Sequence, residues 1–168
     1  MSIAVLSLLF TFGVLAHNAE EAMLPPRWSR SVGKWRAPVE SQRFLFAVTV
    51  LSVVLVLAGI AAFAWGPRSA PAYFFAGYVF AMVANVLFPH VLGSIALRTY
   101  IPGTATALLF NAPLGAIVPY RMVDEGFVER AVLFWTAPIV ALGITGTIPV
   151  LFRFAGRRCG IRTDCAKS

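Results

Sequence analysis

The sequence predicts an all-α membrane protein, a polytopic bundle of about five transmembrane helices forming a single domain over residues 1–168. The first supporting observation is composition, with 59% hydrophobic and only 12% charged residues. The second is the mean hydropathy of +0.80, which lies outside the range of ordinary soluble domains. The third is length: a helix needs about 20 mostly apolar residues to cross a bilayer. A chain of 168 residues therefore has room for such helices and for little else.

The expected spans are long apolar stretches bounded by charges or by Pro and Gly, at residues 2–24, 42–65, 71–97, 102–120 and 130–153. The first has no Lys or Arg before Arg27 and so lacks the basic start of a signal peptide, and we expect it to be retained. The second has only Thr49 and Ser52 as polar side chains and is suited to lipid contact. The fifth places Gly143 and Thr147 on one face, which permits close helix packing.

Basic residues are distributed unevenly among the segments between these spans, and cytoplasmic loops of membrane proteins are enriched in Lys and Arg. An outside N-terminus puts eleven of them in the cytoplasm: Arg27, Arg30, Lys34, Arg36, Arg43, Arg98, Arg153, Arg157, Arg158, Arg162 and Lys167. Three remain outside: Arg68, Arg121 and Arg130. We therefore expect a cytoplasmic C-terminus, a basic cytoplasmic loop at 25–41, a basic cytoplasmic tail at 154–168 and an inner (cytoplasmic) cell membrane. The net charge of +7 then reflects topology, and no nucleic-acid partner is expected.

Three ionisable residues, His17, Glu20 and Glu21, interrupt the end of the first span. Each costs roughly 2.5 kcal/mol or more on insertion scales, so such groups usually face a cavity and serve a function. At about 100° per residue, Glu20 lies about 60° to one side of His17 and Glu21 about 40° to the other. One imidazole and two carboxylates therefore share one helix face.

Two further spans carry polar groups that are expected to reach the same depth. The third contains Asn85 and His90 on either side of Pro89, which should kink the helix, and the fourth contains Asn111. His17 and His90 each lie about 10 Å from the cytoplasmic end of their spans, and Asn111 lies about 13 Å in. Three helices thus deliver polar side chains to one layer near the cytoplasmic side.

Simpler interpretations of the same residues remain open. The two glutamates could lie at the membrane interface and pair with Arg27 or Arg30. The two asparagines could be hydrogen-bonding partners between helices, and His90 could be a packing residue. If these interpretations hold, replacing the ionisable residues should leave function intact.

The string His17-Asn-Ala-Glu20-Glu21 near the end of a first hydrophobic helix resembles the bacterial membrane proteins named for an HXXEE motif. The resemblance extends over most of the chain, through Pro25, Trp28, Arg98-Thr-Tyr-Ile-Pro102-Gly103-Thr104 and Asn111-Ala-Pro113. It implies a small multi-span membrane protein and supports the site residues, and it names no reaction.

Two kinds of chemistry fit this inventory. His17, Glu20, Glu21 and His90 could hold one divalent metal ion of the Zn or Fe type with an open position, although they are too few for a di-iron centre. Without a metal, a desolvated glutamate can keep a proton near neutral pH and act as an acid while a neighbouring His or Glu acts as the base. Such a pair suits isomerisation, cyclisation or hydration.

We expect a membrane enzyme acting on a lipid or isoprenoid-like substrate that enters from the inner leaflet. Asn85 and Asn111 would contact this substrate, and Arg27, Arg30 and Arg98 would hold an anionic head group. A proton- or cation-coupled transporter is the main alternative because intramembrane Glu and His also mark ion paths. Against it, the chain shows no inverted repeat and the outer half of the spans carries no ionisable group. A structural subunit is the remaining alternative.

Overall fold

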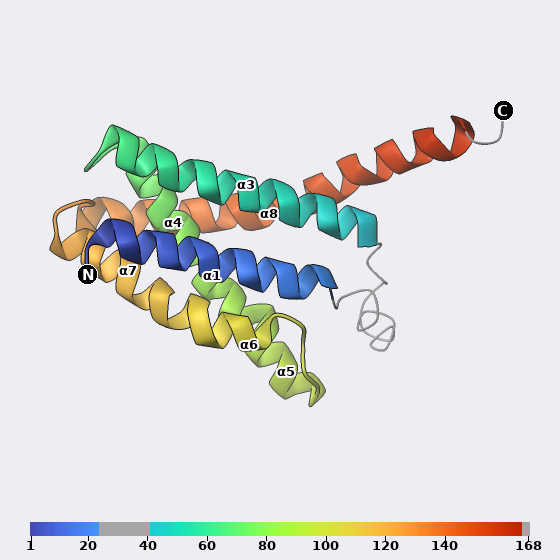
Figure 1. Ribbon diagram of the computed structural model, residues 1–168, viewed down its shortest axis with the longest axis horizontal. Coiled ribbons are helices and arrows are strands. Elements are labelled where there is room, and N and C mark those ends of the chain that lie inside the picture. The colour runs from blue at the N-terminus through green and yellow to red at the C-terminus, as the bar shows by residue number, and fades with distance from the viewer. Residues whose placement is uncertain (24–40, 166–168) are drawn as a thin grey trace.

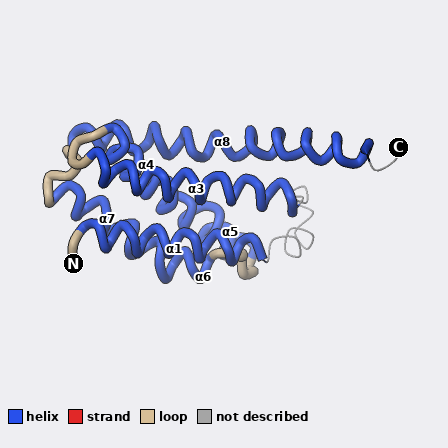
Figure 2. The backbone as a smooth tube through the Cα atoms, turned by 45° about the horizontal axis from the view of Figure 1, so that its top comes forward, coloured by secondary structure: helices blue, strands red, loops and turns tan. Residues whose placement is uncertain are grey.

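The computed structural model describes the backbone of residues 1–23 and 41–165, and side chains within residues 1–23 and 42–156. Within these ranges all regular secondary structure is helical (Figure 2). Nearly all of the predicted basic loop at 25–41, including Arg27 and Arg30, lies outside the described residues. The all-α class expected from the sequence is confirmed.

The helices follow one another along the chain with short connections. Their bounds are α1 Ile3–Met23, α3 Ser41–Trp65, α4 Ala70–Asn85, η1 Val86–Val91, α5 Leu92–Leu97, α6 Thr104–Thr106, η2 Ala107–Asn111, α7 Ala112–Asp124 and α8 Arg130–Cys165, where η1 and η2 are π-helical turns. In the described part of the chain, four helical segments are long and apolar enough to cross a membrane: Ile3–Met23, Gln42–Trp65, Ala70–Leu97 and Arg130–Gly156. They coincide with four of the expected spans and indicate a membrane protein.

The remaining expected span, at 102–120, falls on α6, η2 and α7. This segment is helical from Thr104 to Asp124, but the π-helical turn divides it into pieces, and it is not one of the four membrane-length helices. The number of spans and the side on which each terminus lies therefore stay predictions.

The long helices α1, α3 and the first part of α8 run side by side, with α4 packed against α3 and α8 and α7 packed against α1 and α4 (Figure 1). The start of α1 lies beside the end of α7 and the start of α8, at one end of the bundle. The end of α1 lies at the other end, with α5, α6 and the start of α3. The last part of α8 continues beyond the other helices toward the C-terminus.

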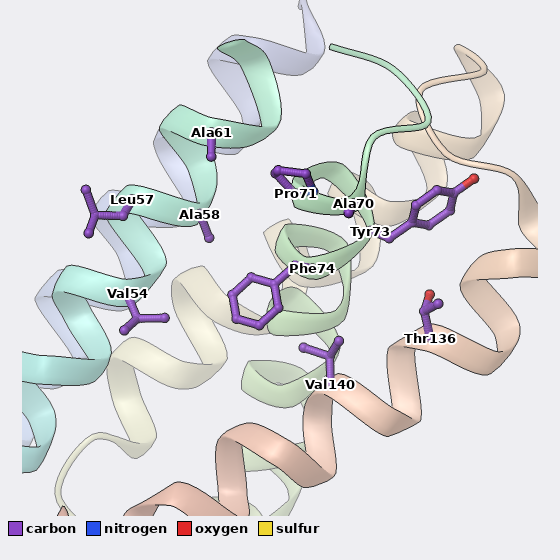
Figure 3. Close-up of a pocket in the computed structure, with 10 residues that line it drawn as sticks. All are labelled: Val54, Leu57, Ala58, Ala61, Ala70, Pro71, Tyr73, Phe74, Thr136 and Val140. Carbon is purple, nitrogen blue, oxygen red and sulfur yellow. The ribbon is translucent and has the colours of Figure 1, made fainter. Parts of the chain in front are cut away.

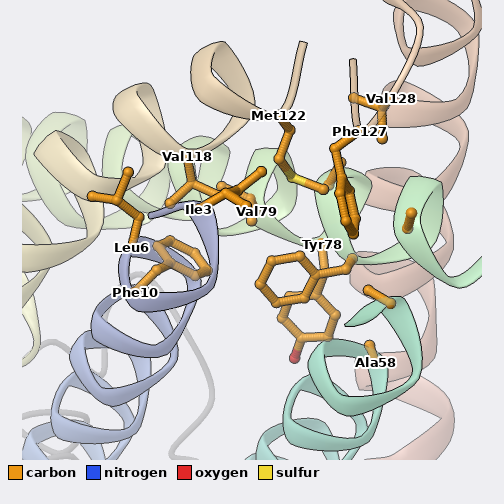
Figure 4. Packing of buried hydrophobic residues seen from close by; sticks show 14 of the residues in the cluster. Ile3, Leu6, Phe10, Ala58, Tyr78, Val79, Val118, Met122, Phe127 and Val128 are labelled. Atoms are coloured by element: carbon orange, nitrogen blue, oxygen red, sulfur yellow. The ribbon is translucent and has the colours of Figure 1, made fainter. Parts of the chain in front are cut away.

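An apolar core fills the first of these two ends (Figure 4). The rings of Phe10 and Phe75 meet edge to face, with centroids 6.5 Å apart and planes at 89°. Tyr78 is buried beside them and donates its hydroxyl hydrogen to the carbonyl of Leu51 at 2.9 Å. The other large members are Ile3, Leu6, Val14, Leu55, Val79, Met82, Val118, Met122, Phe127, Val128 and Leu133. These contacts fix α1, α4 and α7 against one another and thereby position the opposite end.

An apolar groove of about 750 Å³ opens between α3, α4 and α8 at this same end of the bundle (Figure 3). Val54, Ala58, Phe74 and Val140 contribute to its walls, and no ionisable side chain other than the phenol of Tyr73 lines it. Its walls have the character of a lipid-facing surface, and apart from the phenol of Tyr73 they offer no acid or base.

The helix formed by α4, η1 and α5 is kinked where the sequence predicts it. Phe88 has φ −133° and ψ 121°, an extended conformation inside an otherwise helical segment. The ring of Pro89 disfavours the helical conformation at the residue before it, and Pro89 lacks a backbone donor. The chain bends at this point, and His90 in the next position is wholly buried.

Candidate functional site

The candidate site lies where the last turns of α1 meet η1 and the loop that leads into α6. His17 and His90 are both wholly buried, and their rings meet edge to face with centroids 4.7 Å apart. Glu21, one turn after His17 on α1, has 20% of its side chain exposed and reaches the same point. We call His17, Glu21 and His90 the His–Glu cluster.

His17 is oriented by the loop. Its Nδ1 lies 3.0 Å from the carbonyl oxygen of Gly103 and 3.2 Å from the hydroxyl oxygen of Thr106. A carbonyl can only accept a hydrogen bond, so Nδ1 carries the hydrogen. In a neutral ring this leaves Nε2 with a free electron pair, directed toward the rest of the cluster.

The ligand-type atoms of the cluster converge on one small volume. Glu21 approaches both rings, with Oε1 3.2 Å from Nε2 of His90 and Oε2 3.9 Å from Nε2 of His17. One ligand atom from each of the three residues lies within 4.8 Å of the other two. Nδ1 of His90 is buried and has no hydrogen-bond partner among the described residues.

Asn85, the last residue of α4, lies against both imidazoles. Its side-chain amide atom Nδ2 is 3.3 Å from Nε2 of His17 and 3.2 Å from Nε2 of His90. The expectation that Asn85 and the two histidines share one layer agrees with this geometry.

Glu20 faces the loop instead of the two rings. Oε1 accepts hydrogen bonds from the hydroxyl of Tyr100 and from the backbone N–H of Gly103 at 3.0 Å. Oε2 accepts from the hydroxyl of Thr106 at 2.7 Å and from its backbone N–H at 3.4 Å. The first glutamate of the motif thus fastens the loop to α1, and the second belongs to the His–Glu cluster.

Tyr100 belongs to the same group of hydrogen bonds between the loop and α1. Its hydroxyl donates to Glu20 and accepts from the backbone N–H of Ala105 at 3.2 Å. Partial burial, followed by the hydrogen bond to Glu20, raises the pKa of Tyr100 above its usual value. The phenol, which is protonated at neutral pH even at its usual pKa, donates to the carboxylate.

The backbone of Gly103 packs directly against the His–Glu cluster, with no side chain between them. Its φ of +90° is in the left-handed region that favours glycine. A Cβ at this position would lie 2.8 Å from Cε1 of His17, 2.9 Å from Cγ of Glu21 and 2.9 Å from Cε1 of His90. In the sequence, Tyr100 and Gly103 stand out only in the string that carries the family resemblance, and Thr106 does not stand out, because the docking of this loop onto α1 has no local signal.

The other expected site residues lie around this centre. Asn111 at the end of η2 is wholly buried beside Gly13, one helical turn before His17, and neither its Oδ1 nor its Nδ2 has a hydrogen-bond partner among the described residues. Arg98 caps the end of α5 with φ 49° and is exposed. Arg27 and Arg30 lie outside the described residues.

Together these features define a class: a helical membrane protein with two buried histidines and a carboxylate at one end of its bundle. Comparison with known proteins gives the family. The chain matches the family model described as "Protein of unknown function with HXXEE motif" over residues 8–118 and belongs to this family, with His17, Glu20 and Glu21 inside the matched region. The resemblance stated from the sequence is confirmed.

A relative from Bacillus subtilis (strain 168), described as "Uncharacterized protein YrkK", is 34% identical over 145 residues. The alignment covers 86% of this chain and 91% of the relative, so the two proteins correspond over nearly their whole lengths. No solved structure matches this chain.

Proposed function

We propose that this protein is an integral membrane enzyme in which a single divalent metal ion, held by His17, Glu21 and His90, acts on a lipid or isoprenoid-like substrate. The observation that carries the proposal is the convergence of the two Nε2 atoms and one carboxylate in a buried site. Histidines that bind metals usually donate their other ring N–H to a carbonyl or carboxylate. Nδ1 of His17 has this contact with Gly103.

The donor set suits a catalytic metal. Two histidines and a glutamate are a known ligand set of catalytic zinc, which keeps a further position open for water or substrate. Bond lengths of about 2.0–2.1 Å place tetrahedral ligands about 3.3 Å apart. Glu21 lies 3.2 Å from His90 and 3.9 Å from His17, and the three ligand atoms lie within 4.8 Å of one another, so an ion would draw these ligands closer together.

A metal in this position would polarise an oxygen of the substrate or activate a bound water. The chain's own residues would orient the ligands through the loop at 100–106, exclude bulk water by burial, and leave access on the side where Glu21 is exposed. Exposed apolar side chains surround that end of the bundle, among them Leu87, Phe88, Leu92 and Ile95. Such a rim favours a hydrophobic substrate that enters from the inner leaflet of the cytoplasmic membrane.

Asn111 would contact a polar group of that substrate. A buried amide without a partner costs about 1–3 kcal/mol, and both polar atoms of Asn111 lack a partner within the described part of the chain. One turn from His17, a substrate hydroxyl could accept from Nδ2 or donate to Oδ1, whereas a substrate carbonyl could only accept from Nδ2.

A metal-free acid–base mechanism is the second candidate, and one contact favours it. Oε1 of Glu21 lies 3.2 Å from Nε2 of His90, close enough for the two groups to share a proton. In this version Glu21 and His90 would give a proton to the substrate and take one from it.

Metal content separates the two mechanisms. The full chain, purified in mild detergent from metal-supplemented cells, should retain about one ion per chain by elemental analysis. His17→Ala, His90→Ala and Glu21→Gln should lose it. Asn18→Ala is the matched control, since Asn18 is adjacent to His17 but donates to Ser52 on α3 at 2.9 Å. Wild-type protein that holds no metal would rule out the metal mechanism.

The enzymatic role needs a separate measurement. Lipid extracts of cells that express wild type or His90→Ala should differ by at least one lipid or isoprenoid species in mass spectrometry. The metal-free version predicts the same difference without bound metal. Identical extracts would contradict an enzyme acting on membrane lipids and favour the transport or structural roles.

A further inference from the structure

The position of Asn85 is unusual because one amide contacts both histidines. Residues five apart in a regular α-helix point about 140° away from each other. Asn85 and His90 nevertheless lie side by side, because the kinked π-helical turn η1 separates them and turns His90 back toward α1. The local irregularity of this helix thus serves to bring the amide to the two rings.

The hydrogen bonds around His90 conflict with one another. Its Nε2 lies 3.2 Å from Oε1 of Glu21 and 3.2 Å from Nδ2 of Asn85. A carboxylate requires a hydrogen on this nitrogen, whereas an amide N–H requires a free electron pair there. While Glu21 is ionised, one ring nitrogen cannot satisfy both partners.

Rotating the amide by 180° does not remove the conflict. Amide nitrogen and oxygen are assigned from the hydrogen-bond network, so Oδ1 can equally face the rings. Nε2 of His17 would then need a hydrogen as well, although Nδ1 already carries one toward the Gly103 carbonyl. His17 would have to be a cation in a wholly buried position, which is costly.

A metal ion resolves every one of these contacts, because all four groups can then direct an electron pair at the same point. We infer that Oδ1 of Asn85 is the fourth ligand, beside His17, Glu21 and His90; this rests on the proposed metal centre. Asn85 lies 3.3 and 3.2 Å from the two rings, and His90 lies 3.2 Å from Glu21. These three distances match the edge of about 3.3 Å expected for tetrahedral ligands, whereas the distance of 3.9 Å between His17 and Glu21 is longer.

This ligand set specifies the kind of ion. Two imidazoles, one carboxylate and one neutral amide oxygen suit a divalent first-row metal and leave the site with one net positive charge. With Asn85 as a ligand, the position that three protein ligands would leave open is filled. Substrate or water would then bind by expansion to five ligands, as it sometimes does in catalytic zinc sites. Asn85 would accordingly be a direct ligand and not a contact for the substrate.

Cobalt titration tests the assignment, since Co²⁺ reports its coordination through visible absorption. Metal-stripped full-length protein in detergent would be titrated with Co²⁺ for wild type, Asn85→Ala, Asn85→Asp and the control Asn18→Ala. Wild type and Asn18→Ala should bind one Co²⁺ with the intense bands of a four-coordinate site. Asn85→Ala should bind at least about tenfold more weakly, with altered bands. Asn85→Asp supplies an oxygen in the same position and should bind as tightly as wild type or more tightly.

The possible failures are distinct. Wild type that binds no Co²⁺ would overturn the metal centre and this inference together. Wild-type affinity and bands in Asn85→Ala would overturn only the fourth ligand. Weak binding by Asn85→Asp, with helicity unchanged by circular dichroism, would show that the amide N–H groups are required and would also reject Asn85 as an oxygen ligand.

Discussion

The two ends of the bundle are built by different means. At one end the apolar core joins regular α-helices through nondirectional contacts such as the Phe10–Phe75 pair, and the large side chains of this core are buried. At the other end, around the His–Glu cluster, the helices contain two π-helical turns, a kink and a glycine with φ +90°. At this end the contacts are mainly directional hydrogen bonds, such as those that Glu20 accepts from Gly103 and Thr106.

This difference shows where stability and function are expected to reside. Helix association in lipid depends on close packing because the lipid tails are as apolar as the side chains. The apolar core supplies such packing. The cluster end keeps polar atoms that lack a protein partner, Nδ1 of His90 and the amide of Asn111, in the described part of the chain, and it is therefore suited to binding. The comparison predicts that substitutions separate into those that unfold the protein and those that impair metal binding.

Gly103→Ala should have the largest effect on the cluster end. The added methyl group would meet His17, Glu21 and His90 at 2.8–2.9 Å. We expect metal affinity to fall by about 100-fold, at the upper end of the range found when groups that support ligands are changed. Isothermal titration with Zn²⁺ measures this.

The matched control for that variant is Gly126→Ala. Gly126 has φ +69°, and nothing lies within 4 Å of an added Cβ. It carries the same kind of backbone strain, about 1–2 kcal/mol, far from the cluster. Equal losses of metal affinity in both variants would mean that backbone strain, and not filling of the site, explains the effect.

Phe75→Ala should test the apolar core. Removing a buried Phe lowers the free energy of unfolding by about 3–5 kcal/mol in soluble cores, through lost hydrophobic transfer and through the cavity that is left. In lipid the transfer contribution is small because the lipid tails are also apolar, so we expect a loss of about 2 kcal/mol here. Denaturant unfolding in detergent measures the loss, and the folded fraction should bind metal as wild type does.

Phe80→Ala is its control, on the same helix but with an exposed side chain. It should unfold nearly as wild type does. If Phe75→Ala weakened metal binding in the folded fraction as much as Gly103→Ala, the two ends would not be separable.

Glu20→Gln should have an intermediate effect. The amide would lose part of the four hydrogen bonds that Glu20 accepts from Tyr100, Gly103 and Thr106. Because Gly103 in turn holds His17, we expect Zn²⁺ affinity to fall about tenfold while one ion is still bound. Titration calorimetry gives both the affinity and the stoichiometry.

Two comparisons make this prediction specific to the loop. Glu125→Gln removes an exposed ion pair with Arg121 at the opposite end and should leave the affinity unchanged. Tyr100→Phe should reproduce part of the loss. Complete loss of stoichiometric metal in Glu20→Gln would instead make Glu20 a ligand.

Asn18→Ala should have the smallest effect. It removes the hydrogen bond between Asn18 and Ser52, which joins α1 to α3. Such bonds in membrane proteins average about 0.6 kcal/mol. A double-mutant cycle with Ser52→Ala, followed by denaturant unfolding, measures this value, and a coupling several times larger would mean that polar contacts also stabilise the bundle outside the cluster.

The sequence alone was sufficient for several features. Long apolar stretches predicted the four membrane-length helices because crossing a bilayer requires a fixed length of apolar helix. Pro89 predicted the kink because a proline inside a helix removes one backbone hydrogen bond and its ring clashes with the carbonyl four residues earlier. The cost of ionisable groups in lipid directed attention to His17, Glu21 and His90, which the structure brings together.

Only the tertiary structure separated the two glutamates and revealed the role of the loop. On a helical wheel Glu20 and Glu21 lie nearly symmetrically about His17, so periodicity cannot choose between them. The choice is made by Gly103 and Thr106, more than 80 residues later, whose backbone and hydroxyl groups bind Glu20 and leave Glu21 facing the histidines. Contacts between distant segments depend on how the whole bundle packs, and no local pattern in the chain encodes them.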